Sequence, residues 1–542
     1  MTLLIDRRSL LLTGTLGLGA FAVPGFAQLA GVPGARGFTH GVASGEPGAH
    51  SMLLWTRYVP ADGDAVKLRA EIAETPDFAR VIRGGEMITG PWRDHSAKIT
   101  VAGLEPGRRY HYRFVAPDGS VSATGRTRTL PEGAAERFTA AVFSCSNIGF
   151  GYFNAYAHAA ARGDLDLTIH LGDYFYEYAP DNYPAADQLV GNRVPQPMKE
   201  IVALADYRLR YASYRADPDL QAIHAAAPMV VQWDDHESAN DSWEGGAQNH
   251  QDGEGDWLAR KAAAMQAFRE WLPVSDEPWA EYRIGTLASL FRTETRLLGR
   301  SKPPELAPLF VGGGDPVAAL TAFRDGAWQD PAATMMGSVQ EAWLDGAMAR
   351  SVRDGVAWQV VGFGTIMGNT RAPEEALGWI KADAPERTKA YVTAGVTASK
   401  LGLPSNLDNW GGYPAARARF LKSAQALGGS TIVLAGDSHN AWAYDLAQDG
   451  RPAATEFAGQ GVTSPGYESA VAIDPKQVAA ALVRTNPELK WCDTSRRGYM
   501  ALTLTPGEAR NDWVFVDTVR MRGTGASVGH TATVERGRNV MA

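Results

Sequence analysis

The segment that most limits the fold is a strand, a helix and a second strand in direct succession. The sequence predicts a buried strand at Phe138–Ser144, a helix at Tyr152–Ala161 and another buried strand at Leu165–Leu171. This β-α-β order is typical of the start of a layered α/β domain, in which helices cover the faces of a sheet. Three further strand candidates follow later, at Met229–Trp233, Trp358–Gly362 and Thr431–Ala435.

Residues 36–132, ahead of this domain, show short apolar runs that alternate with turn signals. Runs spaced in this way predict the strands of a β-sandwich. Leu104–Tyr112 is similar to the turn and tyrosine corner of a fibronectin type III-like module. We expect this domain to serve packing or positioning. Its strand candidates are Ser51–Thr56, Val66–Ala73, Ala97–Val101 and Arg109–Val115.

The rest of the chain divides into a long α/β domain, residues 133–522, and a C-terminal tail, residues 523–542. A chain of 542 residues has room for two or three domains. Residues 240–345 are rich in Trp, Gly and Asp and show no clean period, which predicts a loop-rich insertion at the rim of a site. The 15 Trp residues of the chain predict a large aromatic core or cleft.

Residues 1–30 are predicted to be an export signal and not part of the fold. Arg7 and Arg8 precede the uncharged run Ser9–Ala27, which is apolar but rich in Gly and Thr. This pattern fits a twin-arginine signal, although Asp6 stands where Ser or Thr is usual. The alternative is a general secretory signal whose two arginines happen to adjoin. We expect export by the twin-arginine translocase and a periplasmic or secreted mature protein.

The mature chain offers no reason to expect a membrane or nucleic-acid partner. No segment after the signal supplies the ~18 apolar residues that a membrane span needs. The net charge of −8 gives no electrostatic attraction to nucleic acid or to an anionic membrane. With hydrophobic residues at 45% and charged residues at 21%, the composition is that of an ordinary soluble protein.

Four polar clusters each follow a predicted strand. In open α/β sheets, functional sites lie at the carboxyl ends of the strands. A single Gly-Asp after a strand is a common turn, and one acidic run can be a solvated loop, but four such clusters in one chain predict a shared site. The clusters are Ser144–Asn147, Gly172–Glu177, Asp234–Glu237 and Gly436–His439.

The order of these clusters resembles that of the calcineurin-like metallophosphoesterases, and more closely that of the PhoD-type alkaline phosphatases. The resemblance covers nearly the whole mature chain. It implies a layered αββα sandwich as catalytic domain, preceded by a fibronectin III-like β-sandwich. Besides the clusters it rests on Gly41–Pro47, Leu54–Arg57, Asp206–Arg208, Trp233–Glu237, Gly412–Pro414 and Phe457–Pro465.

The resemblance implies a first metal held by Cys145, Asp173, Tyr176 and His439. Thiolate, phenolate, imidazole and carboxylate together suit Fe³⁺ better than Ca²⁺ or Mg²⁺. In the wider superfamily the first cluster supplies Asp and His, and Cys145 takes that place here. The alternative for Cys145 is a buried apolar cysteine without a ligand role. We expect no disulfide between the two cysteines and a buried thiol at Cys492.

A second metal would share Asp173 and add Asp235 and Asp437, as the resemblance implies. A shell made only of oxygens is what a hard cation prefers, so Ca²⁺ is expected. The family also implies a further calcium, for which Asp234 and Asn240 are the candidate ligands.

The implied reaction is hydrolysis of phosphate esters, in which a metal-bridging hydroxide attacks phosphorus in line. An acidic protein needs locally placed cations for such a substrate, as metal ions or arginines. His236 is expected to contact the scissile oxygen or to help protonate the leaving group. The alternative is a histidine that only orients Asp235. Arg208 and Arg210 are candidates for phosphate binding or for structural ion pairs.

The predicted function is therefore that of an alkaline phosphatase with phosphodiesterase activity on small phosphate monoesters or diesters. One alternative is a phospholipase D-like phosphodiesterase, which would use the same chemistry in a cleft of different size. The other is a non-catalytic cell-surface binding protein. The sequence predicts further that His170 packs within its strand and that His530 lies at the surface.

Overall fold

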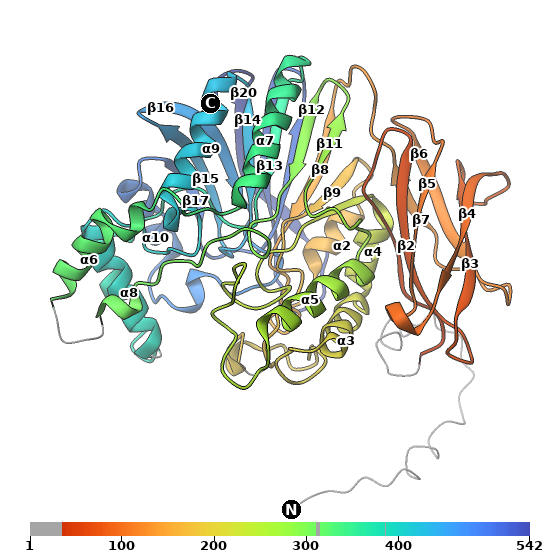
Figure 1. Ribbon diagram of the computed structural model, residues 1–542, viewed down its shortest axis with the longest axis horizontal. Helices are drawn as coiled ribbons and strands as arrows, with labels where there is room; N and C mark the ends of the chain where they lie inside the picture. The colour runs from red at the N-terminus through yellow and green to blue at the C-terminus, as the bar shows by residue number, and fades with distance from the viewer. Residues whose placement is uncertain (1–34, 181, 311–314, 385) are drawn as a thin grey trace, which may run out of the picture.

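The computed structural model describes residues 35–542 apart from residues 181, 311–314 and 385 (Figure 1). The predicted export signal lies outside these described residues. The described part contains a nine-stranded, a seven-stranded and a four-stranded sheet. Within it, no helix has both the length and the apolar character needed to cross a membrane.

The nine-stranded sheet is built around three parallel strands, β8, β9 and β10. Helix α2 (Asn154–Ala160) connects β8 to β9, so the predicted β-α-β unit is confirmed. In sheet order the strands are β20 (Ala526–Glu535), β19 (Glu508–Val516), β18 (Gly498–Leu504), β8 (Phe138–Phe143), β9 (Leu167–His170), β10 (Met229–Val231), β1 (Gly37–Gly45), β2 (Ser51–Val59) and β5 (Ser96–Ala102).

The seven-stranded sheet contains the other parallel strands, β12, β13, β14 and β16. The strands predicted at 358–362 and 431–435 are confirmed as β13 and β14. In sheet order the strands are β11 (Ala280–Ile284), β12 (Ala288–Arg292), β13 (Trp358–Gly362), β14 (Thr431–Ala435), β16 (Arg451–Ala458), β15 (Ala441–Gln448) and β17 (Leu489–Asp493).

The two large sheets pack face to face and helices cover their outer faces, as Figure 1 shows. Strand β8 is buried on both faces, which accounts for its mostly apolar sequence: Val142 packs between the sheets, whereas Phe143 packs toward the helices. The predicted αββα sandwich is therefore confirmed. The covering helices are α3 (Leu204–Arg215), α4 (Pro218–Ala226), α5 (Trp257–Trp271), α7 (Gly337–Arg353), α9 (Pro414–Leu427) and α10 (Pro475–Thr485). Helix α8 (Glu386–Lys400) lies to one side of the sheets, at the lower left of Figure 1.

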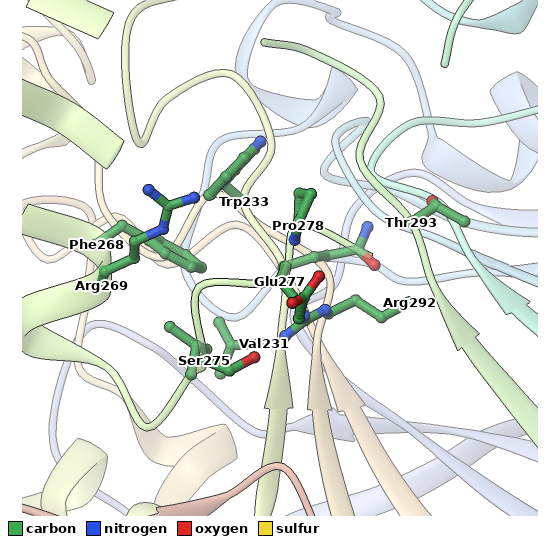
Figure 2. Close-up of a pocket in the computed structure, with 11 residues that line it drawn as sticks. Val231, Trp233, Phe268, Arg269, Ser275, Glu277, Pro278, Arg292 and Thr293 are labelled. Carbon is green, nitrogen blue, oxygen red and sulfur yellow. The ribbon is translucent and has the colours of Figure 1, made fainter. Parts of the chain in front are cut away.

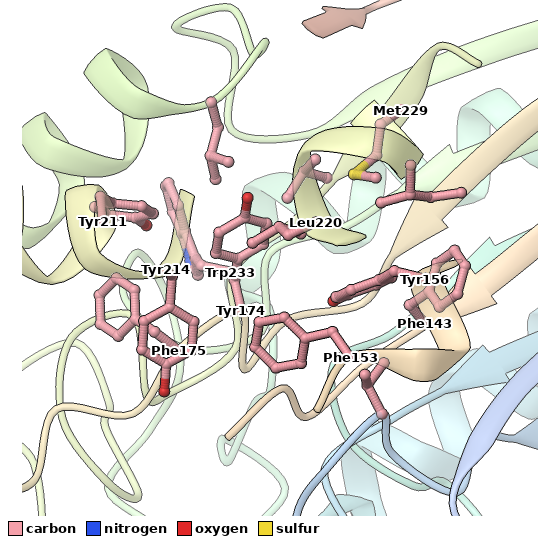
Figure 3. Close-up of a cluster of buried hydrophobic side chains, with 14 of the residues drawn as sticks. Phe143, Phe153, Tyr156, Tyr174, Phe175, Tyr211, Tyr214, Leu220, Met229 and Trp233 are labelled. Carbon is pink, nitrogen blue, oxygen red and sulfur yellow. The ribbon is translucent and has the colours of Figure 1, made fainter. Parts of the chain in front are cut away.

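The core under α2 to α5 is rich in aromatic rings, which Figure 3 shows around Tyr174 and Phe175. Phe175 meets Tyr211 edge to face at 4.7 Å between ring centroids. Such pairs add about 0.5–1.5 kcal/mol beyond the area that they bury. The predicted aromatic core is confirmed, and Trp271, the last residue of α5, is fully buried in it.

The predicted N-terminal β-sandwich is also confirmed. One layer is the β1, β2 and β5 end of the nine-stranded sheet, and the other layer is the four-stranded sheet. The hydroxyl of Tyr110 accepts a hydrogen bond from the Glu105 amide at 3.0 Å, as in a tyrosine corner. The sandwich is not separate, however, because β1 pairs with β10 through Gly45 and Met229. A Cβ on Gly45 would lie 2.2 Å from the Pro273 carbonyl oxygen, so this joint requires glycine. The four strands are β4 (Val81–Thr89), β3 (Val66–Ala73), β6 (Arg109–Val115) and β7 (Gly125–Arg128).

Two expectations about chain organisation differ from the structure. Residues 240–345 are not mainly loop: they contain α5, β11, β12, α6 (Pro316–Asp325) and part of α7, and they begin the second sheet. Residues 523–542 are not a separate tail, because β20 is an edge strand that pairs with β19. β12 owes its place to pairing with β13, which is far along the chain, whereas β20 pairs with β19, its neighbour in sequence.

Candidate metal centre

The carboxyl ends of parallel strands bring the predicted site residues together. Cys145 follows β8, Asp173 follows β9 and Asp235 follows β10, while Asp437 follows β14 of the facing sheet. Among the described residues, His, Cys, Asp and Glu ligand atoms within 4.8 Å of one another form three overlapping groups. These groups are Cys145, Asp173 and His439; Asp173, Asp235 and His236; and Asp173, Asp234, Asp235 and Asp437.

Four of these residues have a backbone conformation that non-glycine residues rarely adopt. The φ angles are 58° at Cys145, 54° at Asp173, 64° at Asp437 and 60° at His439. Each such residue costs of order 1–3 kcal/mol and persists only where its surroundings impose it. Part of that restraint is the buried carboxylate of Glu237, which accepts hydrogen bonds from the backbone amides that follow β9 and β10.

The first predicted ligand set is assembled around His439. Its Nδ1 lies 2.8 Å from the Pro465 carbonyl oxygen, which can only accept, so Nδ1 carries the proton. Nε2 is thereby left with its lone pair, the form in which histidine ligates a metal. The hydroxyl of Tyr176 lies 2.9 Å from this Nε2 and 3.2 Å from Oδ2 of Asp173. Cys145 completes the group and is fully buried.

The second predicted ligand set offers only oxygen atoms. Oδ1 of Asp173 and Oδ1 of Asp235 are buried without a hydrogen-bond partner among the described residues. The other oxygen of Asp235 accepts from the Asp241 amide at 2.7 Å, and Oδ2 of Asp437 accepts from Thr365 at 2.7 Å. Buried carboxylate oxygens left unpaired are costly unless a cation satisfies them, so this group fits a hard cation.

The electrostatics of the two sets also fit bound cations. Burial and the Asp173 carboxylate raise the pKa of the Cys145 thiol well above its ordinary value. Burial, with a further contribution from the Asp235 carboxylate, raises the pKa of Asp173 well above its ordinary value. A positive ion at the centre of the groups would reverse both effects and hold the thiolate and the carboxylate in their ligating forms.

Asp234, a candidate ligand for a further calcium, is bound by an arginine. Nε and Nη2 of Arg296 lie 2.6 and 2.9 Å from its two carboxylate oxygens. The other candidate, Asn240, donates from its side chain to Gln248 and from its backbone amide to Glu177.

His236 is oriented by Glu177. Its Nδ1 lies 2.6 Å from Oε2 of Glu177, which is fully buried and also accepts from Asn240 and Asn249. This contact uses Nδ1 and leaves Nε2 of His236 without a hydrogen-bond partner among the described residues. Burial lowers the pKa of His236, but the carboxylates of Asp235 and Glu177 raise it more, so that it lies well above its ordinary value.

The predicted arginines have structural partners. Arg208 forms an ion pair with Glu270 at 2.7 Å, and Arg210 is fully buried and donates to backbone carbonyls, among them that of Tyr176. Both cysteines are free and buried, as expected.

The predictions for His170 and His530 have different outcomes. His170 is buried in β9, which confirms the prediction. His530 is only partly at the surface, because its ring stacks on Trp491 at 4.1 Å.

Several residues of the centre carried no role in the sequence-based prediction. Glu177 and Glu237 stand inside two of the polar clusters, so their position gave a signal. Ser464, whose hydroxyl lies 2.7 Å from that of Tyr176, falls in the segment Phe457–Pro465. Arg296 gave no signal, because it lies in a segment predicted to be loop.

A small pocket near the centre is not a substrate site. Figure 2 shows Trp233, Phe268 and Arg292 among the residues that line it. Its cavity volume of about 10 Å³ holds one water at most. Arg292 pairs there with Glu46 at 2.5 Å, which joins the N-terminal strands to the second sheet.

An αββα sandwich with ligand side chains at the ends of parallel strands defines the class of metallophosphoesterase-type hydrolases. Within that class the chain belongs to the PhoD-like phosphatase family. Residues 140–513 match the family PhoD-like phosphatase, and residues 27–131 match PhoD-like phosphatase, N-terminal domain. The chain is therefore an enzyme, a phosphatase, and not a non-catalytic binding protein.

Individual relatives agree with this assignment. The chain is 32% identical over 545 residues to alkaline phosphatase D of Bacillus subtilis (strain 168), covering 96% of this chain and 84% of the relative. It is 29% identical to a solved structure of PhoD, with a TM-score of 0.76, covering 94% of this chain and 92% of that one. The purple acid phosphatase PPD1 of yellow lupin shares the fold, with a TM-score of 0.55 at 13% identity, covering 92% of this chain and 75% of that one.

Proposed function

We propose that the protein hydrolyses phosphate monoesters and diesters at a centre that holds Fe³⁺ and Ca²⁺. The observation that carries this proposal is the convergence of two chemically different ligand sets on Asp173. One set adds a thiol, a phenol and an imidazole, which suit a trivalent iron. The other adds Asp235 and Asp437, whose oxygens suit calcium.

The ions would lower the pKa of water and neutralise charge on the phosphoryl oxygens. Two side chains of the protein, those of Asp173 and His236, would have further roles. Asp173, with its unpaired Oδ1, would bridge the two positions. His236, held at Nδ1 by Glu177, would present Nε2–H to the leaving oxygen and donate a proton as the ester bond breaks.

We propose that the protein is exported through the twin-arginine pathway. Arg7 and Arg8 ahead of a mildly hydrophobic run support this route. Proteins that use it cross the membrane folded, which would allow iron to be inserted before export.

A phospholipase D-like diesterase remains the second candidate, because the chemistry of the centre is the same. One experiment tests both functions. The purified protein is assayed on p-nitrophenyl phosphate, on bis(p-nitrophenyl) phosphate and on phosphatidylcholine vesicles, with and without added Ca²⁺. We expect calcium-dependent release of nitrophenol from both nitrophenyl esters. Hydrolysis of the vesicles alone would favour the second candidate, and no hydrolysis of any substrate would contradict both.

A further inference from the structure

A tyrosine ring stands directly beside the proposed proton donor. The ring centroid of Tyr178 lies 5.6 Å from that of His236, with an angle of 60° between the planes. Tyr178 is partly exposed, whereas His236 is buried. The ring therefore offers apolar surface to solvent at the edge of the centre where the leaving group of an ester would lie.

A second ring extends this surface. Tyr183 lies 5.7 Å from Tyr178 between centroids and is also partly exposed. It is fixed on its other side, because its hydroxyl lies 3.2 Å from Nδ1 of His439 and its ring lies 5.3 Å from that of Tyr176. The two rings thus form a continuous aromatic surface that runs from His236 to His439.

The chemistry of the two rings indicates what this surface can bind. The two tyrosine rings favour contact with another planar apolar group. Among the described residues, the hydroxyl of Tyr178 has no hydrogen-bond partner. A planar ring attached to the leaving oxygen would lie next to Tyr178 when that oxygen reaches His236.

Resting on the proposed function, we propose that Tyr178 and Tyr183 form a subsite for an aromatic or heteroaromatic leaving group. Stacking of this kind raises affinity about 2- to 10-fold per ring pair. The protein should therefore prefer aryl phosphates to alkyl phosphates by more than the reactivity of the leaving groups explains.

The test compares phenyl phosphate with ethyl phosphate, assayed by the release of inorganic phosphate from the metal-loaded protein. Tyr178→Leu should raise KM for phenyl phosphate about 2- to 10-fold and leave KM for ethyl phosphate unchanged. Tyr178→Phe keeps the ring and should keep the wild-type KM for both substrates. Trp92→Leu removes an exposed ring from the β-sandwich, away from the centre, and should change neither value.

The outcomes separate this proposal from the proposed function. Equal effects of Tyr178→Leu on the two substrates, or loss of the aryl preference in Tyr178→Phe, would overturn the subsite while leaving the phosphatase intact. A wild-type protein that hydrolyses neither substrate would instead overturn the proposed function. Iron and calcium contents equal to those of the wild type show that the variants are folded around the centre.

Discussion

Arg296 and Asp234 form a buried ion pair in which both carboxylate oxygens are bound by one guanidinium group. The same guanidinium binds Asp408 at 2.5 Å and lies 3.7 Å from Asp235 and 3.8 Å from Asp437. Both partners of the pair are almost inaccessible to solvent. Arg296 is therefore a permanent cation inside the acidic cluster beside the proposed calcium ligands, and Arg300 adds a second one at Asp408, 2.7 Å from its carboxylate.

Replacing Arg296 by methionine should destabilise the protein strongly. The change leaves buried carboxylates without their cation, which costs about 3–5 kcal/mol when one partner of a buried pair is removed. Arg296→Lys keeps the charge but loses the two-point contact, so we expect an intermediate loss. Denaturant unfolding measures both effects. Arg484→Met, which breaks an exposed ion pair with Glu375, is the control and should cost less than about 1 kcal/mol. Similar losses in all three variants would contradict this role of Arg296.

His236→Ala should lower turnover and leave metal content near that of the wild type. Loss of a proton donor costs about 10²- to 10⁴-fold in rate. Glu177→Gln should give a smaller loss, because His236 remains but its orientation and charge are less well fixed. Steady-state kinetics and elemental analysis on the same samples provide the measurement. Loss of iron or calcium in His236→Ala would make this histidine a ligand or a structural residue instead.

The sequence predicts the centre well where a ligand lies within a few residues of an apolar strand. Asp173 and Asp437 are such residues, since the end of a strand is a local signal and parallel strands place their ends at one edge. Arg296 could not be found in this way, because its partner Asp408 is 112 residues away. The same reason applies to residues 240–345, where β12 joins the second sheet by pairing with β13, a strand far along the chain.

The two metal positions should respond differently to chelation and to substitution. Calcium bound only by carboxylates exchanges with solvent, so a calcium-selective chelator should abolish activity and added Ca²⁺ should restore it. Iron bound by Cys145, Tyr176 and His439 should be retained, with a visible tyrosine-to-Fe³⁺ charge-transfer colour. Cys145→Ala should bleach or shift this colour and depress activity, whereas Cys492→Ala, a buried thiol outside the centre, should do neither. Zinc or magnesium at both positions, with no iron, would contradict the assignment.

Export should depend on the arginine pair near the start of the chain. Replacing Arg7 and Arg8 by lysine keeps the charge but removes the twin-arginine motif. We expect unprocessed precursor in the cytoplasm, detected by fractionation and immunoblotting. Replacing Arg536 and Arg538 by lysine is the matched control and should leave export unchanged. Normal processing of the variant changed at Arg7 and Arg8 would point to a general secretory signal.

Glu456, a buried residue of β16, should make the free energy of unfolding fall as pH rises from about 4.5 to about 7. Burial raises the pKa of Glu456 from 4.5 to about 7, even though the amides of Met367 and Gly368 donate to its carboxylate at 2.7 Å. The pKa of Glu456 is higher in the folded protein than in the unfolded protein, so its contribution to the free energy of unfolding is complete below about pH 4.5. This contribution decreases as pH rises to about 7, by up to about 3 kcal/mol in all, and no longer changes at higher pH.

Glu456→Gln should remove this slope, because glutamine resembles the protonated acid and does not titrate. The measurement is the free energy of unfolding of wild type and variant at several values between pH 4.5 and pH 8, taken as the difference at each pH. Titration of all other groups cancels in that difference. Glu508→Gln changes an exposed glutamate of β19 and serves as the control, with a difference that stays flat. If the difference between wild type and Glu456→Gln is equally flat, Glu456 has the same pKa in the folded and unfolded protein, which would contradict the prediction.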